Sequence, residues 1–274
     1  MDVKNNIFVW VTFFFLMAPF CLCSAELPLT DEALSTTVVI KVGSGVRPPF
    51  LIDKNQHGFE GVGPEILQVF NQIQKQFHFV INEIPSKRKV NAVQDGKLDI
   101  MMWDNRIWGW GDSTKQSSSL VDSKDVYFTL KEKGREQRFF DDFTGKKIAL
   151  VIGYHYKIAD FSTDISFLSN HFDVTMVRTE EASIKMTMAG RVDIAVVSET
   201  ALEWYLIRFP EYRSKILISD IYDTQYSRYF VLPANSPIKA HEINGILTLA
   251  NKRGLLAPIY KKYGLVKPSP FLTD

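Results

Sequence analysis

The chain alternates between short apolar runs and longer segments in which apolar residues recur every three or four positions. Short runs rich in β-branched and aromatic residues predict buried strands, and the longer periodic segments predict amphipathic helices. In the first half of the chain, Pro64 suits the first turn of one helix, and Ser86 suits the N-cap of another. The expected strands here are 38–42, 79–84 and 98–103. One expected helix begins at Pro64, and another extends over 87–95.

The second half of the chain repeats this order. Thr179 suits the N-cap of one helix, Ser198 or Glu199 begins another that Pro210 stops, and Ser236 opens a last long one. The expected strands are 146–152, 174–178 and 192–197, and the expected helices are 156–169, 180–189, 198–208 and 236–252, with a short amphipathic segment at 255–263. Alternating strands and helices are typical of an open, mostly parallel sheet with helices on its faces.

One local unit occurs twice: a helix that ends at glycine, then a basic residue, an aliphatic residue and an aspartate that begins a strand. Glycine past a helix end allows the left-handed turn that redirects the chain, and the basic residue suits the negative end of the helix dipole. We expect both aspartates to fix the starts of their strands. The two copies are Gly96-Lys97-Leu98-Asp99 and Gly190-Arg191-Val192-Asp193.

Two strand-like runs, 125–130 and 228–232, remain outside the repeated order. We interpret them as crossovers between two lobes, which together form a two-strand hinge. The predicted fold class is therefore α/β, with two lobes that are each an open, mostly parallel sheet flanked by helices. The expected boundaries are 36–125 plus 227–274 for the first lobe and 126–226 for the second.

The N-terminus has the pattern of a secretory signal peptide. Lys4 precedes the apolar run 7–20, which is too short for an ordinary membrane span. Small residues near Ala25 predict cleavage after it, so that residues 1–25 are removed and the mature protein is soluble and periplasmic. Lipidation at Cys21 or Cys23 and a retained membrane anchor are the alternatives.

The composition excludes several classes of function. The 32 basic and 31 acidic residues balance, and no basic stripe indicates a nucleic-acid partner. The five histidines are scattered without the spacing of a metal site, and Gly43-Ser44-Gly45 lacks the spacing of a nucleophile elbow. We therefore expect no metal, no cofactor and no catalytic residue.

Several short motifs follow one another along nearly all of the mature chain. In this order the sequence resembles the bacterial extracellular solute-binding proteins of family 3, the amino-acid-binding periplasmic receptors of ABC importers. The motifs are Gly43, Pro48-Pro49-Phe50, Gly61-Val62-Gly63-Pro64-Glu65-Ile66, Gln94-Asp95-Gly96-Lys97-Leu98-Asp99, Phe143-Thr144-Gly145-Lys146-Lys147-Ile148, Gly190-Arg191-Val192-Asp193 and Ile259-Tyr260-Lys261-Lys262-Tyr263-Gly264.

The resemblance implies a monomeric receptor whose two lobes close on a small polar or anionic, amino-acid-like ligand. Ligand contacts with both lobes would stabilise the closed state through their differential affinity. The implied partner is an inner-membrane ABC permease.

The sequence departs from the family pattern at the positions that recognise an α-amino acid. Arg47 replaces the aromatic residue that stacks on the ligand, and the Thr-x-x-Arg element expected after Asp99 is absent. Ser198 falls where the family has an aspartate for the ligand ammonium, and Glu199 lies beside it. The identity of the ligand therefore stays open.

In open α/β sheets, ligands bind beyond the carboxyl ends of strands, near helix N-termini. Arg47, Arg88 and Arg106 are cations able to bind a carboxylate, and Trp103 can provide an aromatic wall. Structural roles are the alternative for each residue: core packing for the aromatic residues, solvation for the arginines and dipole compensation for Glu65. The candidate ligand-binding residues are Arg47, Phe50, Glu65, Arg88, Trp103, Arg106, Tyr154, Tyr156, Ser198 and Glu199.

Two other functions use the same fold. One is a ligand-sensing receptor that reports to a separate membrane signalling protein. The other is a cyclohexadienyl dehydratase-like enzyme, in which Glu199 or Glu65 would serve as the acid.

Overall fold

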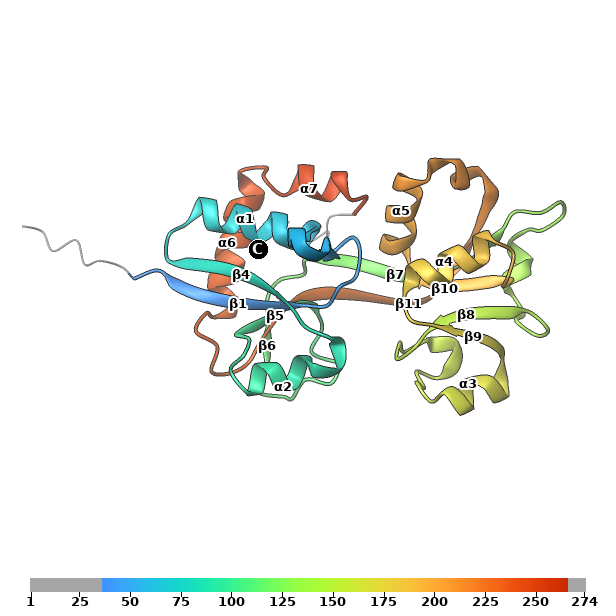
Figure 1. The fold of residues 1–274 in the computed structure, drawn as a ribbon, viewed down its shortest axis with the longest axis horizontal. Helices are drawn as coiled ribbons and strands as arrows, with labels where there is room; N and C mark the ends of the chain where they lie inside the picture. Colours follow the sequence, from blue (N-terminus) through green and yellow to red (C-terminus); the bar gives the residue numbers. More distant parts are fainter. Residues whose placement is uncertain (1–35, 266–274) are drawn as a thin grey trace, which may run out of the picture. The chain divides into compact units, whose positions relative to one another are not determined.

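The computed structural model describes residues 36–265 and consists of two α/β lobes joined by two long strands (Figure 1). The predicted signal peptide, with its cleavage point and both cysteines, lies outside the described residues. Within residues 36–265, no helix combines the length and the apolar character needed to cross a membrane.

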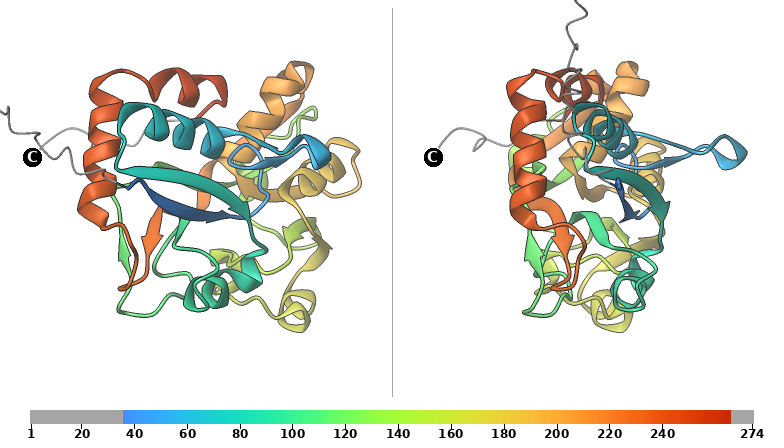
Figure 2. Two further views of the ribbon diagram at one scale, coloured as in Figure 1. Left: turned by 60° about the vertical axis from the view of Figure 1, so that its left-hand side comes forward. Right: turned by 90° about the vertical axis from the view of Figure 1, so that its left-hand side faces the viewer.

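The first lobe is built on three parallel strands, β1 (Val38–Ser44), β4 (Phe77–Glu83) and β5 (Ile100–Asp104). On one face lie α1 (Val62–Ile73), α6 (Ala240–Lys252) and α7 (Ala257–Lys262), and on the other lies α2 (Lys89–Gln94) (Figures 1 and 2). The predicted stripe of α1 packs inward, because Ile66 and Phe70 are fully buried in the core beside Phe230.

The second lobe repeats the arrangement with β8 (Lys147–Val151), β9 (Asp173–Val177) and β10 (Ile194–Ser198), again parallel. Two cores form here, one against α4 (Glu180–Met188) and α5 (Glu199–Arg208) and the other on the side of α3 (Ile165–His171). Thr179 caps α4 and Ser198 caps α5, as predicted.

Strands β7 (Val121–Leu130) and β11 (Ile216–Leu232) belong to both lobes. They pair antiparallel at the centre of a sheet with the order β4-β1-β5-β11-β7-β10-β8-β9, with the short β6 (Lys115–Gln116) beside β11. The predicted two-strand hinge is confirmed. The sequence predicted only the last part of β11, because polar residues interrupt the apolar pattern of its first part. The pairing of β7 with β11 also shifts register between Ile218 and Tyr222. A small hairpin of β2 (Ile52–Asp53) and β3 (Phe59–Glu60) follows the first loop.

Three helix predictions are corrected. The expected helix over 156–169 is wrong: left-handed backbone at Asp160 and Phe161 separates the 3-10 turn η4 (Lys157–Ala159) from α3. Ser86 makes no cap hydrogen bond, because its segment begins with a second 3-10 turn, η2 (Ser86–Arg88). The last long helix begins at Ala240 rather than at 236.

The repeated unit has the predicted structure in both lobes. Gly96 and Gly190 adopt φ values of +68° and +64°, in the left-handed region that glycine tolerates best. The Asp99 carboxylate accepts the Lys41 backbone N–H at 2.7 Å, and the Asp193 carboxylate accepts that of Lys147 at 2.8 Å. Each aspartate therefore connects the start of its own strand to the neighbouring strand.

Candidate functional site

The carboxyl ends of the parallel strands bring together six side chains from distant parts of the sequence. They come from the loop after β1, the loop after β8, the start of α4 and the two crossover strands β7 and β11. We call this group the charge cluster; its members are Arg47, Asp125, Tyr154, Glu180, Tyr226 and Arg228.

One part of the charge cluster connects the two lobes. The guanidinium carbon of Arg47, in the first lobe, lies 5.1 Å from the ring centre of Tyr154, in the second lobe. The Tyr154 hydroxyl donates to Glu180 at 3.3 Å, and Glu180 also accepts the Ser198 backbone N–H at 2.7 Å. A cation, a phenol and a carboxylate thus follow one another from one lobe to the other.

A second part lies on the crossover strands themselves. The Tyr226 hydroxyl donates to the Asp125 carboxylate at 2.8 Å, and it accepts an N–H of Arg228 at 3.2 Å. A second guanidinium nitrogen of Arg228 donates to the Trp103 carbonyl at 3.2 Å. The two crossover strands and the end of β5 are therefore joined by one hydrogen-bonded chain.

Three aromatic rings surround the Arg228 guanidinium, and we call them the aromatic cage. Its carbon lies 5.3 Å from the ring centre of Phe50, 5.1 Å from that of Trp108 and 4.9 Å from that of Tyr226. Trp103 packs against Phe50 with ring centres 4.7 Å apart. Cations are attracted to aromatic faces at such distances, so the three rings hold the guanidinium in this position.

The environment sets the protonation of the cluster. Burial raises the pKa of Asp125 to about 7, with a further contribution from the Glu180 charge, although the Tyr226 hydrogen bond and Arg228 act in the opposite direction. Burial lowers the pKa of Arg47, but nearby Tyr154 and Glu180 outweigh it, and the net effect is to raise this pKa. Arg47 therefore stays charged, while Asp125 exchanges its proton near neutral pH.

Burial also raises the pKa of the Tyr154 hydroxyl and that of Tyr226 above the usual value for tyrosine. Both phenols are neutral at physiological pH and can donate or accept hydrogen bonds. As whole residues, both tyrosines are half-buried.

Four of the residues predicted from the sequence touch this site. Arg47 and Tyr154 belong to the charge cluster, and Phe50 forms one wall of the aromatic cage. Ser198 contributes its backbone N–H to Glu180, while its hydroxyl accepts the Ala201 N–H as the cap of α5.

Three other predicted residues make their contacts within one lobe. Glu65 connects α1 to α7 by accepting from Lys262 at 2.5 Å and from the Tyr263 hydroxyl at 2.7 Å. Tyr156 is fully buried in the second lobe, where its hydroxyl accepts the Val151 N–H at 2.9 Å. Trp103 is 6% exposed and packs in the first core, which is the structural alternative considered for it.

The remaining three predicted residues lie apart from the cluster contacts. Arg88 and Arg106 are exposed, and among residues 36–265 their side chains form no hydrogen bond or ion pair. Half-buried Glu199 lines a hollow of about 500 Å³ together with Lys124 and Tyr222, and no member of the charge cluster lines this hollow. Burial raises the pKa of the Glu199 carboxyl, partly opposed by Lys124.

Sequence reasoning missed Asp125, Glu180, Tyr226 and Arg228. Glu180 follows the Thr179 cap, where an acidic residue has an ordinary explanation in the helix dipole. Arg228 leads an apolar run that was assigned only to a crossover strand. The available signal was a charged residue at the start of a buried strand, since a buried arginine is rarely left without a role.

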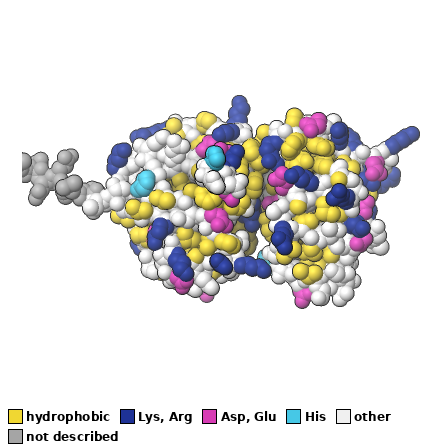
Figure 3. Space-filling view, viewed as in Figure 1, with side chains coloured by type: hydrophobic (Ala, Val, Ile, Leu, Met, Phe, Trp, Pro, Cys, Tyr) yellow, Lys and Arg dark blue, Asp and Glu magenta, His cyan; other side chains and the backbone are white. Residues whose placement is uncertain are grey.

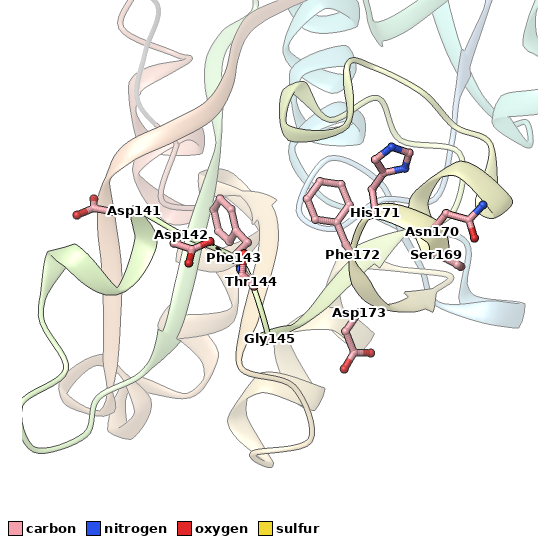
Figure 4. A pocket seen from close by; sticks show the side chains of 10 residues that line it. All are labelled: Asp141, Asp142, Phe143, Thr144, Gly145, Ser169, Asn170, His171, Phe172 and Asp173. Carbon is pink, nitrogen blue, oxygen red and sulfur yellow. Dashed lines mark hydrogen bonds between the residues drawn. The ribbon is translucent and has the colours of Figure 1, made fainter.

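A hollow of about 570 Å³ lies elsewhere on the second lobe (Figure 4). It adjoins the first residues of β8 and β9, so it is at the amino ends of these strands, opposite the charge cluster. No group of metal-binding side chains occurs within the described part of the chain. The lining residues are Asp141, Asp142, Phe143, Thr144, Gly145, Ser169, Asn170, His171, Phe172 and Asp173.

The surface carries mixed charges. On the face drawn in Figure 3, basic and acidic side chains are interspersed among apolar ones, without a continuous basic stripe. This face agrees with the balanced composition of the whole chain.

Comparisons with known proteins identify the fold. No protein-family model matches the chain, and no curated protein sequence matches it significantly. Many solved structures do match. The GluR0 ligand-binding core from Nostoc punctiforme in complex with L-glutamate is 20% identical with a TM-score of 0.60, and the match covers 82% of this chain and 98% of that one.

Two further structures have similar scores. A substrate-binding protein of an ABC uptake transporter from Streptococcus pneumoniae, with bound histidine, has a TM-score of 0.64 at 15% identity, over 82% of this chain and 92% of that one. An ancestral amino-acid-binding protein, a precursor of cyclohexadienyl dehydratase, has a TM-score of 0.62 at 16% identity, over 82% and 94%. The chain thus has the two-lobed type II fold of periplasmic binding proteins, which confirms the predicted fold class and the resemblance at the level of fold.

Proposed function

We propose that this protein is a periplasmic solute-binding receptor that captures a small polar or anionic ligand between its two lobes. The observation that carries the proposal is the contact of Arg47, in the first lobe, with Tyr154, in the second, at the carboxyl ends of the strands. This edge is where open α/β sheets bind ligands. A ligand that touches both lobes stabilises the closed arrangement over the open one.

Three side chains of the charge cluster have a proposed role in ligand binding. Arg47 provides a fixed cation for an anionic group of the ligand, and the neutral phenols of Tyr154 and Tyr226 provide hydrogen bonds. In this proposal the moving bodies are the lobes predicted from the sequence, residues 36–125 plus 227–274 and residues 126–226.

The proposed partners follow from the class of protein. The receptor, exported by residues 1–25, would deliver its ligand as a monomer to an inner-membrane ABC permease. The compared structures include substrate-binding proteins of ABC transporters, which supports this proposed partner. No nucleic acid is involved in the proposed activity, and no catalytic step is part of it.

Binding can be tested with one variant and a matched control. A thermal-shift screen of amino acids, small carboxylates and cationic metabolites identifies a ligand, because a ligand that binds only the folded state raises the melting temperature. Arg47→Ala should then lower the affinity for that ligand by tenfold or more in calorimetry, a loss of about 1.4 kcal/mol in binding free energy. The control is Arg253→Ala, an exposed arginine at the end of α6, which should leave the affinity unchanged. Equal affinity in both variants would remove the charge cluster as the binding site.

An enzyme is the second candidate function. Asp125, with its pKa of about 7, is able to donate a proton at neutral pH, and one compared structure is a precursor of cyclohexadienyl dehydratase. Incubation of the purified protein with prephenate or arogenate tests this candidate. Formation of an aromatic product that Asp125→Asn abolishes would favour the enzyme over the receptor.

A further inference from the structure

Arg228 occupies the aromatic cage as an internal cation. Only 2% of the residue is exposed, and its guanidinium carbon lies within 5.3 Å of the centres of all three cage rings. Trp108 and Tyr226 are half-buried, with ring centres 5.5 Å apart, so the cage borders on solvent. Aromatic groups in this arrangement bind guanidinium and quaternary ammonium ions.

The surroundings of Arg228 contain donors without acceptors. Its Nε is buried and makes no hydrogen bond to any described residue. The Arg47 guanidinium has no hydrogen-bonded acceptor either among residues 36–265, and its contact is the Tyr154 ring. Buried donors without partners are costly, so these groups favour a ligand that supplies acceptor oxygens.

The carboxylates nearby are already paired. Lys89 donates to Asp104 at 2.9 Å, and Tyr226 donates to Asp125. Glu180 accepts the Ser198 N–H and the Tyr154 hydroxyl. A ligand ammonium would compete with these donors for the carboxylate oxygens and would also face the Arg228 charge.

We propose that Arg228 fills the cation position of the aromatic cage and thereby excludes ligands with cationic groups, so that the site accepts an anion that carries no ammonium. The inference rests on the receptor function proposed above and names its ligand class, small carboxylates and related oxyanions. It makes Arg228 a specificity-determining residue.

Removal of Arg228 should open the cage to an external cation. Arg228→Ala is titrated with methylguanidinium and with tetramethylammonium, and its melting temperature is followed against that of the wild type. The variant should be stabilised saturably at concentrations at least tenfold lower than any that stabilise the wild type. Arg228→Met, which refills the cage with an apolar chain, should lose this response, and Arg253→Ala should behave as the wild type.

Two results would overturn the inference. One is an equal response of Arg228→Ala and Arg228→Met to the cations. The other is tight binding of arginine, lysine or tetramethylammonium by the wild-type protein. This measurement needs no variant, so it tests the inference even if Arg228→Ala does not fold.

Matched ligands separate this inference from the receptor function. 2-Oxoglutarate and succinate are compared with L-glutamate and L-aspartate, which add an ammonium to similar carboxylates. Tighter binding of the oxo acid and the diacid by tenfold or more supports the inference. Equal or tighter binding of an amino acid upholds the receptor and overturns the inference. If none of the four binds while the cation response of Arg228→Ala is present, the role of Arg228 is supported and the receptor function loses its support.

Discussion

The two copies of the repeated unit are alike where their strands begin and different where their strands end. At the start, Asp99 and Asp193 accept backbone N–H groups of Lys41 and Lys147 with nearly equal geometry. At the end, the first copy leads to a buried tryptophan, whereas the second leads to a serine that caps a helix. The repeated unit therefore gives both lobes the same strand start, whereas the strand ends give each lobe different side chains.

The backbone differs at these ends as well. Trp103 has φ +64°, a left-handed conformation that is costly for a bulky residue and is held here by packing on Phe50. Ser198 is extended, at φ −64° and ψ 139°, as an N-cap requires. The first end thus depends on side-chain packing, and the second depends on hydrogen bonding.

Replacing the two end residues should show this difference most clearly. Trp103→Ala removes a buried ring from the first core and should lower the free energy of unfolding by about 3–5 kcal/mol. Ser198→Ala removes one cap and should lower it by about 1 kcal/mol. Urea denaturation of both variants measures the two values. Equal losses would show that the two ends are held by the same kind of interaction.

The carboxyl group of Asp125, on the strand beside Ser198, should make the free energy of unfolding depend on pH. Asp125 pairs in register with Ser198 and has a pKa of about 7, against an ordinary value of 3.8. The folded protein therefore holds a proton that the unfolded chain has lost, and stability should fall as pH rises from about 4 to about 7, by at most about 4 kcal/mol.

Asp125→Asn tests this dependence, because the amide cannot ionise but its oxygen can still accept from Tyr226. The variant should be more stable than the wild type above pH 7 and similar to it below pH 4. Denaturation at a series of pH values gives the comparison. Parallel pH profiles for the two proteins would contradict the assignment of the proton to Asp125.

The next expected effects are at the shared strand starts. Asp99→Ala and Asp193→Ala each remove a charge-assisted hydrogen bond to the backbone and should each cost about 2 kcal/mol. The control is Asp95→Ala, since among residues 36–265 this exposed carboxylate pairs only with exposed Lys97, so its loss should change stability by less than about 0.5 kcal/mol. Clearly unequal losses at Asp99 and Asp193 would break the likeness of the two units.

The sequence predicted the elements whose causes are local. The helix ends at Gly96 and Gly190, the caps at Thr179 and Ser198 and the alternation of strands and helices follow from neighbouring residues alone. The helix expected over 156–169 failed because Tyr156, apolar and well placed in the periodic pattern, is buried by contacts with β8 instead of by a helix.

The site was predictable only in part. Arg47 and Tyr154 were found because they lie in loops that follow predicted strands. Asp125 and Arg228 acquire their environment from the register of β7 with β10 and of β11 with β5, which involves residues far apart in the sequence. Nothing near them in the chain indicates these pairings.

Asp125, Tyr226 and Arg228 lie on the very strands that connect the lobes. Any rotation between the lobes must therefore bend the backbone that carries these groups, and any change in their hydrogen bonds alters the energy of that bending. In the proposed receptor, recognition and motion would therefore share these residues, so a substitution that changes the preferred ligand should also change the balance between the open and closed arrangements.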